Sequence, residues 1–544
     1  MQCFRGKCVS EGTAIGKIFV YRRDRQQIQR VEVEDVRREK DRYHRASEKA
    51  VKQLGEMYAK AVEEAGESYA AIFEVHQMLL KDNGFIQSVE HIIEMQGANA
   101  EYAVNVTGEK YAQMFETMDD EYMRGRGADI KDISERLLAA LRGGATNSIR
   151  LEEPVIVVAD DLTPSEAVQM DKDKVLAYVT VHGSRNSHTA ILARTMGVPA
   201  LAGTDIPPEE ALDGKRAAVD GAGGYLFVEP DEKTSARMRE QQSREEAQKR
   251  RLEELKGKKS ITPDGKQVML YANISDIRDL DSAVRNDAEG IGLFRSEFLC
   301  LEAGDFPGEE EQFRIYKKVA ETMSGRRAVI RTWDIGADKG CGGFRVEPGE
   351  NPALGCRGIR ICLERPEIFK TQLRALLRAS VFGNIAVMYP MITSLWEIHR
   401  ISEIVEEVRK ELKDRRMEYG EPEQGIMIET PAAALISGEL AKEVDFFSIG
   451  TNDLTQYTLA ANRQDPRLDI FYDIRHPAVF RLVELIIENA HKAGIQAGIC
   501  GELGADPELI REFLAMGADS FSVPPGQILP VRRAIRERDS GPLI

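Results

Sequence analysis

The feature that most limits the fold of this chain is an alternation of short apolar runs with helical stretches from Ile261 onward. A strand of a parallel sheet is buried on both faces and therefore reads as a near-continuous apolar run. Eight such runs lie at residues 268–273, 290–294, 328–333, 385–389, 425–429, 446–450, 496–500 and 520–523. Eight strand–helix units in about 280 residues match a closed (β/α)8 barrel, whereas a doubly wound open sheet needs fewer strands. We therefore predict a TIM barrel over residues 261–544.

The residues before the barrel have a different pattern, in which strand signals flank a long helical segment. Short β-type runs such as residues 17–21 come first, and a strand signal returns at residues 153–158. Between them, residues 31–141 are highly charged, lack proline and repeat apolar residues at helical spacing. That pattern is typical of amphipathic helices packed in a bundle.

The whole chain is thus predicted to be multidomain, α/β plus all-α. Residues 1–21 and 146–229 are assigned to one β/α domain, and residues 22–145 to a helical insertion within it. Residues 230–260 turn to Glu, Arg, Lys and Gln with few apolar residues, which favours an exposed linker helix. The barrel follows this linker.

Composition is typical of soluble globular proteins and excludes several classes of partner. Apolar residues make up 42% and charged residues 30% of the chain. We find no apolar run of about 18 residues and no signal peptide, so we expect a cytoplasmic protein without membrane insertion. The net charge of −16 disfavours nucleic acid, so an anionic ligand requires local arginine or lysine clusters. The seven cysteines show no CxxC pair and are expected to be reduced thiols.

Reactive side chains gather where the predicted barrel strands end. The carboxyl ends of the strands and the loops after them form the functional face of a TIM barrel. The residues at or just after these ends are Arg295, Arg331, Glu429, Asn452, Asp453 and Cys500, and Arg463 lies on the segment after the sixth strand. Residues of this kind do not recur at the strand beginnings, so the sequence predicts one site at one end of the barrel.

Three arginines, two carboxylates and a thiol indicate the chemistry of that site. Guanidinium groups form paired hydrogen bonds with phosphate and carboxylate groups, which favours a small, doubly anionic substrate. Glu429 and Asp453 offer oxygen ligands suited to Mg²⁺, and an un-ionised Cys500 would serve as a general acid toward an enolate. Each assignment has a structural alternative. A strand-end arginine is often only a salt-bridge partner, Cys500 can be a buried apolar residue, and Glu429 can cap the following turn.

A second centre is predicted at His188, in the β/α domain. The strand at residues 175–181 leads through residues 183–187 into an apolar helix, with Ser187 placed as N-cap and His188 in the first turn. Unpaired backbone N–H groups at a helix start stabilise a phosphoryl group, and a neutral imidazole is a nucleophile near pH 7. The alternatives are that His188 only caps its own helix, or that His182 at the strand end is the nucleophile.

Together these motifs resemble the Enzyme I family of the bacterial sugar phosphotransferase system, the phosphoenolpyruvate–protein phosphotransferases. The resemblance covers essentially the whole chain. It is carried by the blocks at residues 6–16, 162–165, 183–199, 292–298, 331–336, 351–355, 425–431, 447–456 and 498–502.

The resemblance implies a phosphohistidine domain that swivels, a helical insertion that binds the phosphocarrier HPr, and a barrel that binds phosphoenolpyruvate and forms a homodimer. His188 would take the phosphoryl group and pass it to a histidine of HPr, releasing pyruvate in the first step of sugar uptake. Substrate binding is implied for Arg295, Arg331, Asn452, Asp453 and Arg463, with Arg357 as a weaker match. The implied Mg²⁺ ligands are Glu429 and Asp453, and the implied proton donor to the enolate is Cys500.

Three positions depart from the commoner family pattern: Ser184, Asn186 and Ala167. The first two lie in the loop before His188, so they bear on local hydrogen bonding and rate and leave the nucleophile in place. Two other functions remain open. One is a dikinase or phosphoenolpyruvate-synthase-like enzyme, which needs a nucleotide-binding domain ahead of the histidine domain, and the other is a non-enzymatic signalling homologue that has lost site residues.

Overall fold

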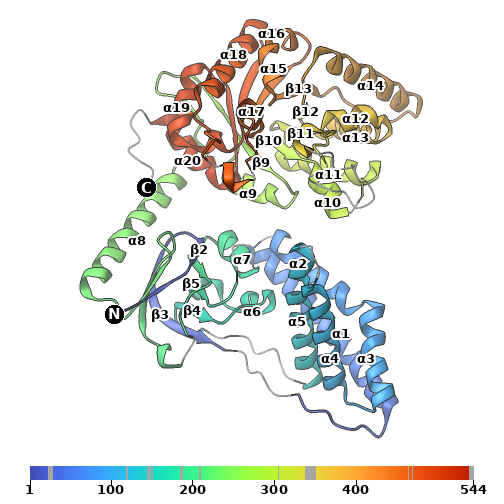
Figure 1. Cartoon of the computed structure of the whole chain (residues 1–544), viewed down its shortest axis with the longest axis vertical. Helices are drawn as coiled ribbons and strands as arrows, with labels where there is room; N and C mark the ends of the chain where they lie inside the picture. Colours follow the sequence, from blue (N-terminus) through green and yellow to red (C-terminus); the bar gives the residue numbers. More distant parts are fainter. Residues whose placement is uncertain are drawn as a thin grey trace. The chain divides into compact units, whose positions relative to one another are not determined.

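The structure is a computed structural model that describes residues 1–22, 28–65, 67–117, 121–143, 149, 151–183, 188–207, 210–303, 305–336, 351–463, 465–468 and 470–537. The chain divides into two compact units, Met1–Lys249 and Arg250–Ile544 (Figure 1). Among the described residues, every helix is too short or too polar to cross a lipid bilayer.

The first unit contains one eight-stranded mixed sheet, in the order β1-β8-β7-β3-β4-β5-β6-β2. Its strands are β1 (Gln2–Arg5), β2 (Lys7–Ser10), β3 (Thr13–Tyr21), β4 (Val155–Ala159), β5 (Val175–Thr180), β6 (Ala200–Ala202), β7 (Arg216–Asp220) and β8 (Tyr225–Val228). Strand β3 pairs in parallel with β4, although more than a hundred residues separate them along the chain. The two pieces of the predicted β/α domain therefore form one sheet.

In the part of the helical insertion that the structure describes, five helices are found: α1 (Val36–Ala65), α2 (Glu67–Leu80), α3 (Asn83–Gln96), α4 (Ala100–Glu116) and α5 (Glu121–Leu141). Side chains such as Leu54, Phe73 and Val104 are fully buried in its core. The same core includes Leu192, because the bundle packs against α6 (Pro164–Gln169) and α7 (His188–Met196). The Lys60 ammonium group on α1 also donates to the backbone carbonyl of Val168 at 2.7 Å.

Helix α8 (Glu232–Glu253) leaves the sheet and is bound to it along much of its length. Met238 is fully buried against Phe227 of β8. Further along the helix, the Glu245 carboxylate accepts hydrogen bonds from the backbone N–H and the hydroxyl of Thr13, at 2.8 and 2.9 Å. The linker helix predicted over residues 230–260 therefore ends earlier, at Glu253, and much of it is fastened to the first unit.

The second unit is a closed barrel of eight parallel strands, as the sequence predicts. The strands are β9 (Met269–Ile274), β10 (Ile291–Arg295), β11 (Ala328–Arg331), β12 (Ile385–Tyr389), β13 (Glu423–Ile428), β14 (Phe446–Gly450), β15 (Gln496–Cys500) and β16 (Ser520–Val523). Around them lie α9 (Asp279–Arg285), α10 (Glu297–Ala303), α11 (Glu309–Met323), α12 (Ile359–Glu364), α13 (Pro366–Ala379), α14 (Leu395–Asp414), α15 (Pro431–Leu435), α16 (Ser437–Leu440), α17 (Thr451–Leu459), α18 (Pro477–Ala493), α19 (Pro507–Met516) and α20 (Ile528–Arg536). Side chains such as Leu293, Val329 and Met427 fill the barrel interior.

Arg532 on α20 anchors the segment that follows α8. Its guanidinium is fully buried and donates to the Leu255 carbonyl at 3.1 Å, the Ser260 hydroxyl at 3.2 Å and the Asp287 carbonyl at 2.7 Å. It also forms an ion pair with the Asp287 carboxylate. We expect Arg532→Met to lower the free energy of unfolding of the barrel by about 3–5 kcal/mol, because Leu255, Ser260 and Asp287 lose a charged donor that is itself fully buried.

Urea unfolding followed by circular dichroism would measure this loss. Arg533→Met is the matched control, since the neighbouring Arg533 forms an ion pair with the half-exposed Glu537 one turn away, at 3.7 Å, and its loss should cost less than about 1 kcal/mol. Equal unfolding free energies for the two variants would contradict the anchoring role of Arg532.

The cysteines follow the sequence-based expectation except at one position. Cys3, Cys8, Cys356, Cys362 and Cys500 are free thiols. Cys300 is disulfide-bonded, so the prediction of a reduced thiol is wrong there, and Cys341 lies outside the described residues. A disulfide needs two cysteines whose Cα atoms lie within about 7 Å, a distance that spacing along the chain does not reveal.

Candidate active site

The barrel brings the predicted residues to one end, because all eight strands are parallel and closed into a ring. Arg295 and Arg331 are register partners at the ends of β10 and β11. Glu429 directly follows β13, and Asp453 lies in the first turn of α17, which directly follows β14. Cys500 ends β15, where it pairs in register with Gly450. The side chains predicted from the strand ends thus share one rim.

Arg331 is held by two carboxylates that sequence reasoning did not single out. Its side chain is only 7% exposed and forms ion pairs with Glu297, at the start of α10, and with Asp334 at 3.0 Å. Asp334 also accepts from Arg357 at 3.1 and 3.2 Å, so one carboxylate joins two guanidinium groups. Burial lowers the pKa of both guanidinium groups, but the nearby charge of Asp334 acts in the opposite direction, and the pKa of each arginine is raised above its usual value. Two fixed positive charges therefore persist at the rim.

The salt-bridge alternative for the strand-end arginines is thus realised for Arg331, although its partners are themselves buried. Glu297 is 1% exposed and Asp334 is 2% exposed. Buried ion pairs fix geometry more than they stabilise a fold, because desolvation offsets much of the attraction. Such an arrangement is suited to presenting guanidinium groups in a defined direction.

Glu429 is a buried carboxylate among other carboxylates. It is 1% exposed and accepts a hydrogen bond from the Met391 backbone N–H at 2.7 Å. Burial raises its pKa, and repulsion from Asp453 and Asp334 raises it further, whereas the two arginines act in the opposite direction. The capping alternative is wrong, because Thr430 rather than Glu429 accepts from the N–H of Ala433 in α15.

Close approach of β14 to Glu429 requires a glycine. A Cβ atom at Gly450 would lie 2.8 Å from the Glu429 Cβ and 2.9 Å from a carboxylate oxygen. Any larger residue at this strand end would push Glu429 out of the rim. The backbone of β14 therefore sets how near Glu429 lies to the first turn of α17, which carries Asp453.

The carboxylates of Glu429 and Asp453 suit Mg²⁺ better than a metal ion whose ligands must all come from the protein. Within the described ranges, no group of three or more His, Cys, Asp or Glu side chains is arranged to hold a metal ion. Mg²⁺ keeps several waters and binds through one or two carboxylates together with substrate phosphates. Glu429 and Asp453 supply such a pair, and a divalent cation would relieve the repulsion between them.

Cys500 lies at the top of the barrel interior as an un-ionised thiol. It is 2% exposed and belongs to the same buried cluster as Leu293 and Met427. The alternative interpretation from the sequence, that Cys500 is a small buried residue of the core, therefore also describes it. Burial raises its pKa, although Arg295 and Arg331 lower it. A thiol that keeps its proton near neutral pH is suited to donate that proton.

Asn452 and Arg463 are placed differently from the buried group. Asn452 is half-buried, and its backbone carbonyl accepts from the Tyr472 hydroxyl at 3.0 Å. Arg463 is exposed, and its backbone N–H donates to the Gln456 side chain at 3.2 Å. Neither of these contacts bears on substrate binding, so the roles of Asn452 and Arg463 stay predictions.

A buried polar relay behind the rim ties the two arginine-bearing strand ends together. The Ser296 hydroxyl donates to the Arg331 carbonyl at 2.7 Å and accepts from the Gln372 side chain at 3.0 Å. The Gln372 side chain also accepts from the backbone N–H of Trp333 at 3.1 Å and donates to the Tyr316 hydroxyl at 3.1 Å. Ser296, Gln372 and Tyr316 have no measurable exposure. The only sequence signal for this relay is a glutamine on the apolar face of α13.

The histidine centre begins as the sequence predicts, with α7 starting at His188. Residues 184–187, including the expected N-cap Ser187 and the departures Ser184 and Asn186, lie outside the described residues, as does the side chain of His188. The next residue, Thr189, is buried and donates its hydroxyl to the Leu162 carbonyl at 3.0 Å, which ties the first turn of α7 to the loop before α6. The rival His182 lies in an exposed turn after β5.

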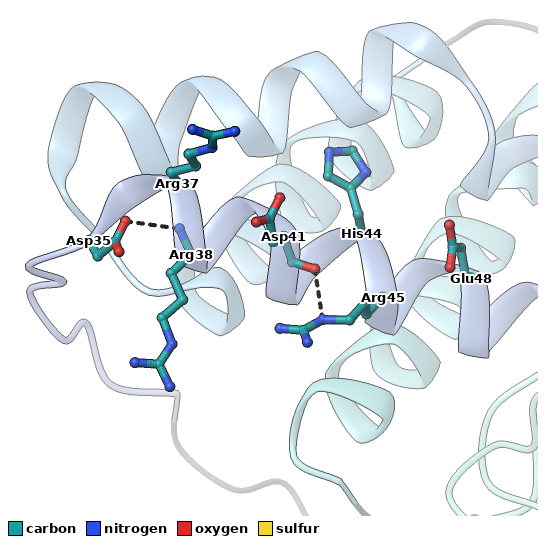
Figure 2. A pocket seen from close by; sticks show the side chains of 7 residues that line it. All are labelled: Asp35, Arg37, Arg38, Asp41, His44, Arg45 and Glu48. Carbon is teal, nitrogen blue, oxygen red and sulfur yellow. Dashed lines mark hydrogen bonds between the residues drawn. The ribbon is translucent and has the colours of Figure 1, made fainter.

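A surface hollow of about 530 Å³ lies along α1, away from these residues in the sequence (Figure 2). It is lined by Asp35, Arg37, Arg38, Asp41, His44, Arg45 and Glu48. Figure 2 shows the Arg45 guanidinium bonded to the Asp41 carbonyl, and His44 lies 2.7 Å from Glu90. Acidic and basic groups alternate along this helix face, so it is a solvated surface without a concentrated charge for an anionic ligand.

Comparison with known proteins decides the family. Three domain families of phosphoenolpyruvate (PEP)-utilising enzymes match this chain. They are the N-terminal domain over residues 5–126, the mobile domain over residues 151–224 and the PEP-binding domain over residues 249–540. A phosphoenolpyruvate-protein phosphotransferase of Bacillus sp. (strain S) is 40% identical over 98% of this chain and 92% of its own length. This chain belongs to the family of phosphoenolpyruvate-protein phosphotransferases.

A second relative agrees with this assignment. The phosphoenolpyruvate-protein phosphotransferase of Listeria innocua is 40% identical over 99% of this chain and 95% of its own length. A solution structure of an Enzyme I protein is 36% identical, covers 45% of this chain and 99% of its own, and has a TM-score of 0.39. In the matches to PEP-utilising enzymes, His188 lies within the mobile domain and Arg331 lies within the PEP-binding domain. The resemblance predicted from the sequence is confirmed.

Proposed function

We propose that this phosphotransferase moves the phosphoryl group of phosphoenolpyruvate to its own His188 and then to a histidine of the phosphocarrier HPr, releasing pyruvate. One observation carries the proposal. Two buried arginines, Arg331 and Arg357, share Asp334 at the barrel rim beside Glu429. Guanidinium groups held in this way support binding of a small anion, in a chain about 40% identical to enzymes named for transfer from phosphoenolpyruvate to protein.

At the barrel rim, the arginines would bind the substrate through its two anionic groups. Arg295, Arg331 and Arg357 pair with phosphate and carboxylate oxygens, and Asn452 and Arg463 complete the contacts from the segment after β14. Mg²⁺ held by Glu429 and Asp453 would neutralise charge on the phosphoryl group and the enolate oxygen. Phosphoryl transfer needs little else from the protein than such positioning and charge neutralisation.

Bond changes in the first half-reaction are simple. A nitrogen of neutral His188 attacks phosphorus, the bond from phosphorus to the enol oxygen breaks, and the oxygen keeps the electron pair as an enolate. The enolate carbon then takes the proton of the Cys500 thiol and becomes the methyl group of pyruvate. The thiolate regains a proton from water. In the second half-reaction the phosphoryl group passes from His188 to HPr.

The remaining parts of the chain have roles that follow from this cycle. We propose that HPr binds the helical insertion, which packs against α7, the helix that His188 begins. The phosphohistidine domain swivels between the barrel and HPr, the barrels form a homodimer, and the protein acts in the cytoplasm in sugar uptake. A crosslink between the histidine domain and the helical insertion should therefore block labelling from phosphoenolpyruvate.

Incubation with ³²P-labelled phosphoenolpyruvate and Mg²⁺, followed by phosphopeptide mapping, tests the function. The expected result is one labelled peptide containing His188, and loss of its label when HPr is added. Labelled ATP in place of phosphoenolpyruvate should give no label. Labelling from ATP would instead support a dikinase-like reaction, and no labelling from either donor would support a non-enzymatic homologue.

Removal of Mg²⁺ is expected to suppress labelling of His188, with recovery when the ion is restored. Glu429→Gln should lower the labelling rate by about 100- to 1,000-fold, because a neutral amide is a poor ligand for the ion. Binding of Mn²⁺ measured by electron paramagnetic resonance gives a readout independent of activity. Glu439→Gln, at an exposed position on α16, is the matched control. Unchanged ion binding in Glu429→Gln would contradict this metal site.

A further inference from the structure

We propose that Asn273 is a positioning residue for the Cys500 thiol, holding its proton in a defined direction until the enolate forms. This inference rests on the proposed function, in which Cys500 donates that proton. It adds a residue that neither the strand-end pattern nor the family match assigns. The argument depends on three neighbouring strands, β9, β16 and β15, which carry Asn273, Ser522 and Cys500.

The orientation of the Asn273 amide is set by Ser522 from two sides. Its Nδ2 group donates to the Ser522 backbone carbonyl at 2.8 Å. The Ser522 hydroxyl donates to Asn273 Oδ1. A flipped amide would place Nδ2 against the hydroxyl and leave the carbonyl without its donor, so the two bonds together fix which end of the amide is the oxygen.

The fixed oxygen faces the thiol. Asn273 Oδ1 lies 3.7 Å from Cys500 Sγ, a separation at which a thiol donates a weak hydrogen bond. An amide oxygen only accepts, so the sulfur must be the donor and must carry its proton. Asn273 thereby favours the neutral thiol over the thiolate and restricts its rotation.

Access to the thiol is restricted in the same region. Cys500 is 2% exposed, and Ser522 is 5% exposed, whereas Asn273 is half-buried at the rim. Gly292 on β10 leaves room for the Ser522 side chain, because a Cβ there would lie 2.2 Å from the Ser522 hydroxyl oxygen. The backbone of β10 thus permits the contact that orients Asn273.

The step that depends on this arrangement is protonation of the enolate. The thiol S–H bond breaks, its proton bonds to C3 of the enolate, and the sulfur retains the electron pair until water protonates it. Only a thiol held on one side of the enolate delivers the proton to one face of C3. Breaking the phosphorus–oxygen bond does not need this proton, so the two steps can be measured separately.

The experiment uses the full-length protein and phosphoenolpyruvate carrying a stereospecific tritium label at C3, with turnover in D₂O. The methyl group of the pyruvate product then reports which face took the deuteron. We expect wild-type protein to give one configuration and Cys500→Ala to give a racemic methyl group. Asn273→Leu should lose at least half of the stereochemical excess, while phosphorylation of His188 slows less than about tenfold.

Two further variants keep the test decisive. Ser522→Ala removes one of the bonds that orient the amide and should reduce the stereochemical excess even if Asn273→Leu folds poorly. Asn489→Leu removes a half-buried asparagine elsewhere in the barrel, where it donates to Ser437 at 2.9 Å, and should retain full stereochemistry.

Each outcome distinguishes this inference from the proposed function. If the wild-type protein fails to phosphorylate His188 from phosphoenolpyruvate, the proposed function fails. If it phosphorylates and Cys500→Ala gives racemic product, but both Asn273→Leu and Ser522→Ala keep the wild-type excess, Asn273 has no positioning role. If Asn489→Leu loses the excess as fully as Asn273→Leu, the effect is a general loosening of the barrel and the inference is also overturned.

Discussion

His188→Ala is expected to abolish transfer of label from phosphoenolpyruvate to the protein and on to HPr, while leaving phosphoenolpyruvate binding unchanged. This change removes the proposed nucleophile from the start of α7, in the compact unit that ends at Lys249. The arginines and carboxylates that would bind the substrate belong to the other unit. The dissociation constant measured by calorimetric titration should therefore stay within about twofold of wild type, a difference below 0.5 kcal/mol.

His182→Ala is the matched control for this prediction. His182 is an exposed histidine in the same loop region, and its backbone N–H donates to the Asp160 carbonyl at 2.8 Å, a bond that alanine retains. We expect this variant to label at close to the wild-type rate. Label on His188→Ala together with loss of label on His182→Ala would transfer the role of nucleophile to His182.

Arg331→Met is expected to lower kcat/KM for phosphoenolpyruvate by about 1,000-fold. Loss of one preorganised donor to a developing anion costs about 100- to 1,000-fold, and a bidentate, buried guanidinium lies at the upper end of that range. The same change leaves Glu297 and Asp334 buried with one cation fewer. Removing one partner of a buried ion pair costs about 3–5 kcal/mol, so the free energy of unfolding should fall as well.

The two effects are separated by measuring kinetics well below the unfolding transition of the variant. Urea unfolding gives the stability loss, and labelling of His188 under steady-state conditions gives kcat/KM. Arg400→Met, at a partly exposed position on α14 where Arg400 pairs with Glu403 at 2.7 Å, is the control for removal of an arginine. A value of kcat/KM within tenfold of wild type for Arg331→Met would exclude a central role in substrate binding.

The barrel and the place of its site were predictable because both follow from local patterns. A strand buried on both faces must be apolar throughout, so β12, β14, β15 and β16 have the predicted bounds. A polar residue where such a run stops must lie on the rim of the barrel. The start of α7 at His188 was predictable for a similar reason, since the apolar run of its helix begins just after that residue.

The partners of the rim residues were not predictable in the same way. Asp334 joins Arg331 to Arg357, and Gln372 reaches Ser296 from a helix 76 positions later in the chain. Such contacts depend on which side chains the closed barrel brings within hydrogen-bond distance, and the apolar pattern does not encode this. The disulfide of Cys300 and the contact of Asn273 with Cys500 were missed for the same reason.

Helix α8 belongs to both compact units, because the division between them falls at Lys249 and Arg250, inside the helix. The Thr13–Glu245 hydrogen bonds bind α8 to the sheet beyond the middle of the helix, and Arg532 of the second unit binds the chain again at the Leu255 carbonyl. Between Glu245 and Leu255 the chain therefore passes from the contacts of the first unit to those of the second, over the last part of α8.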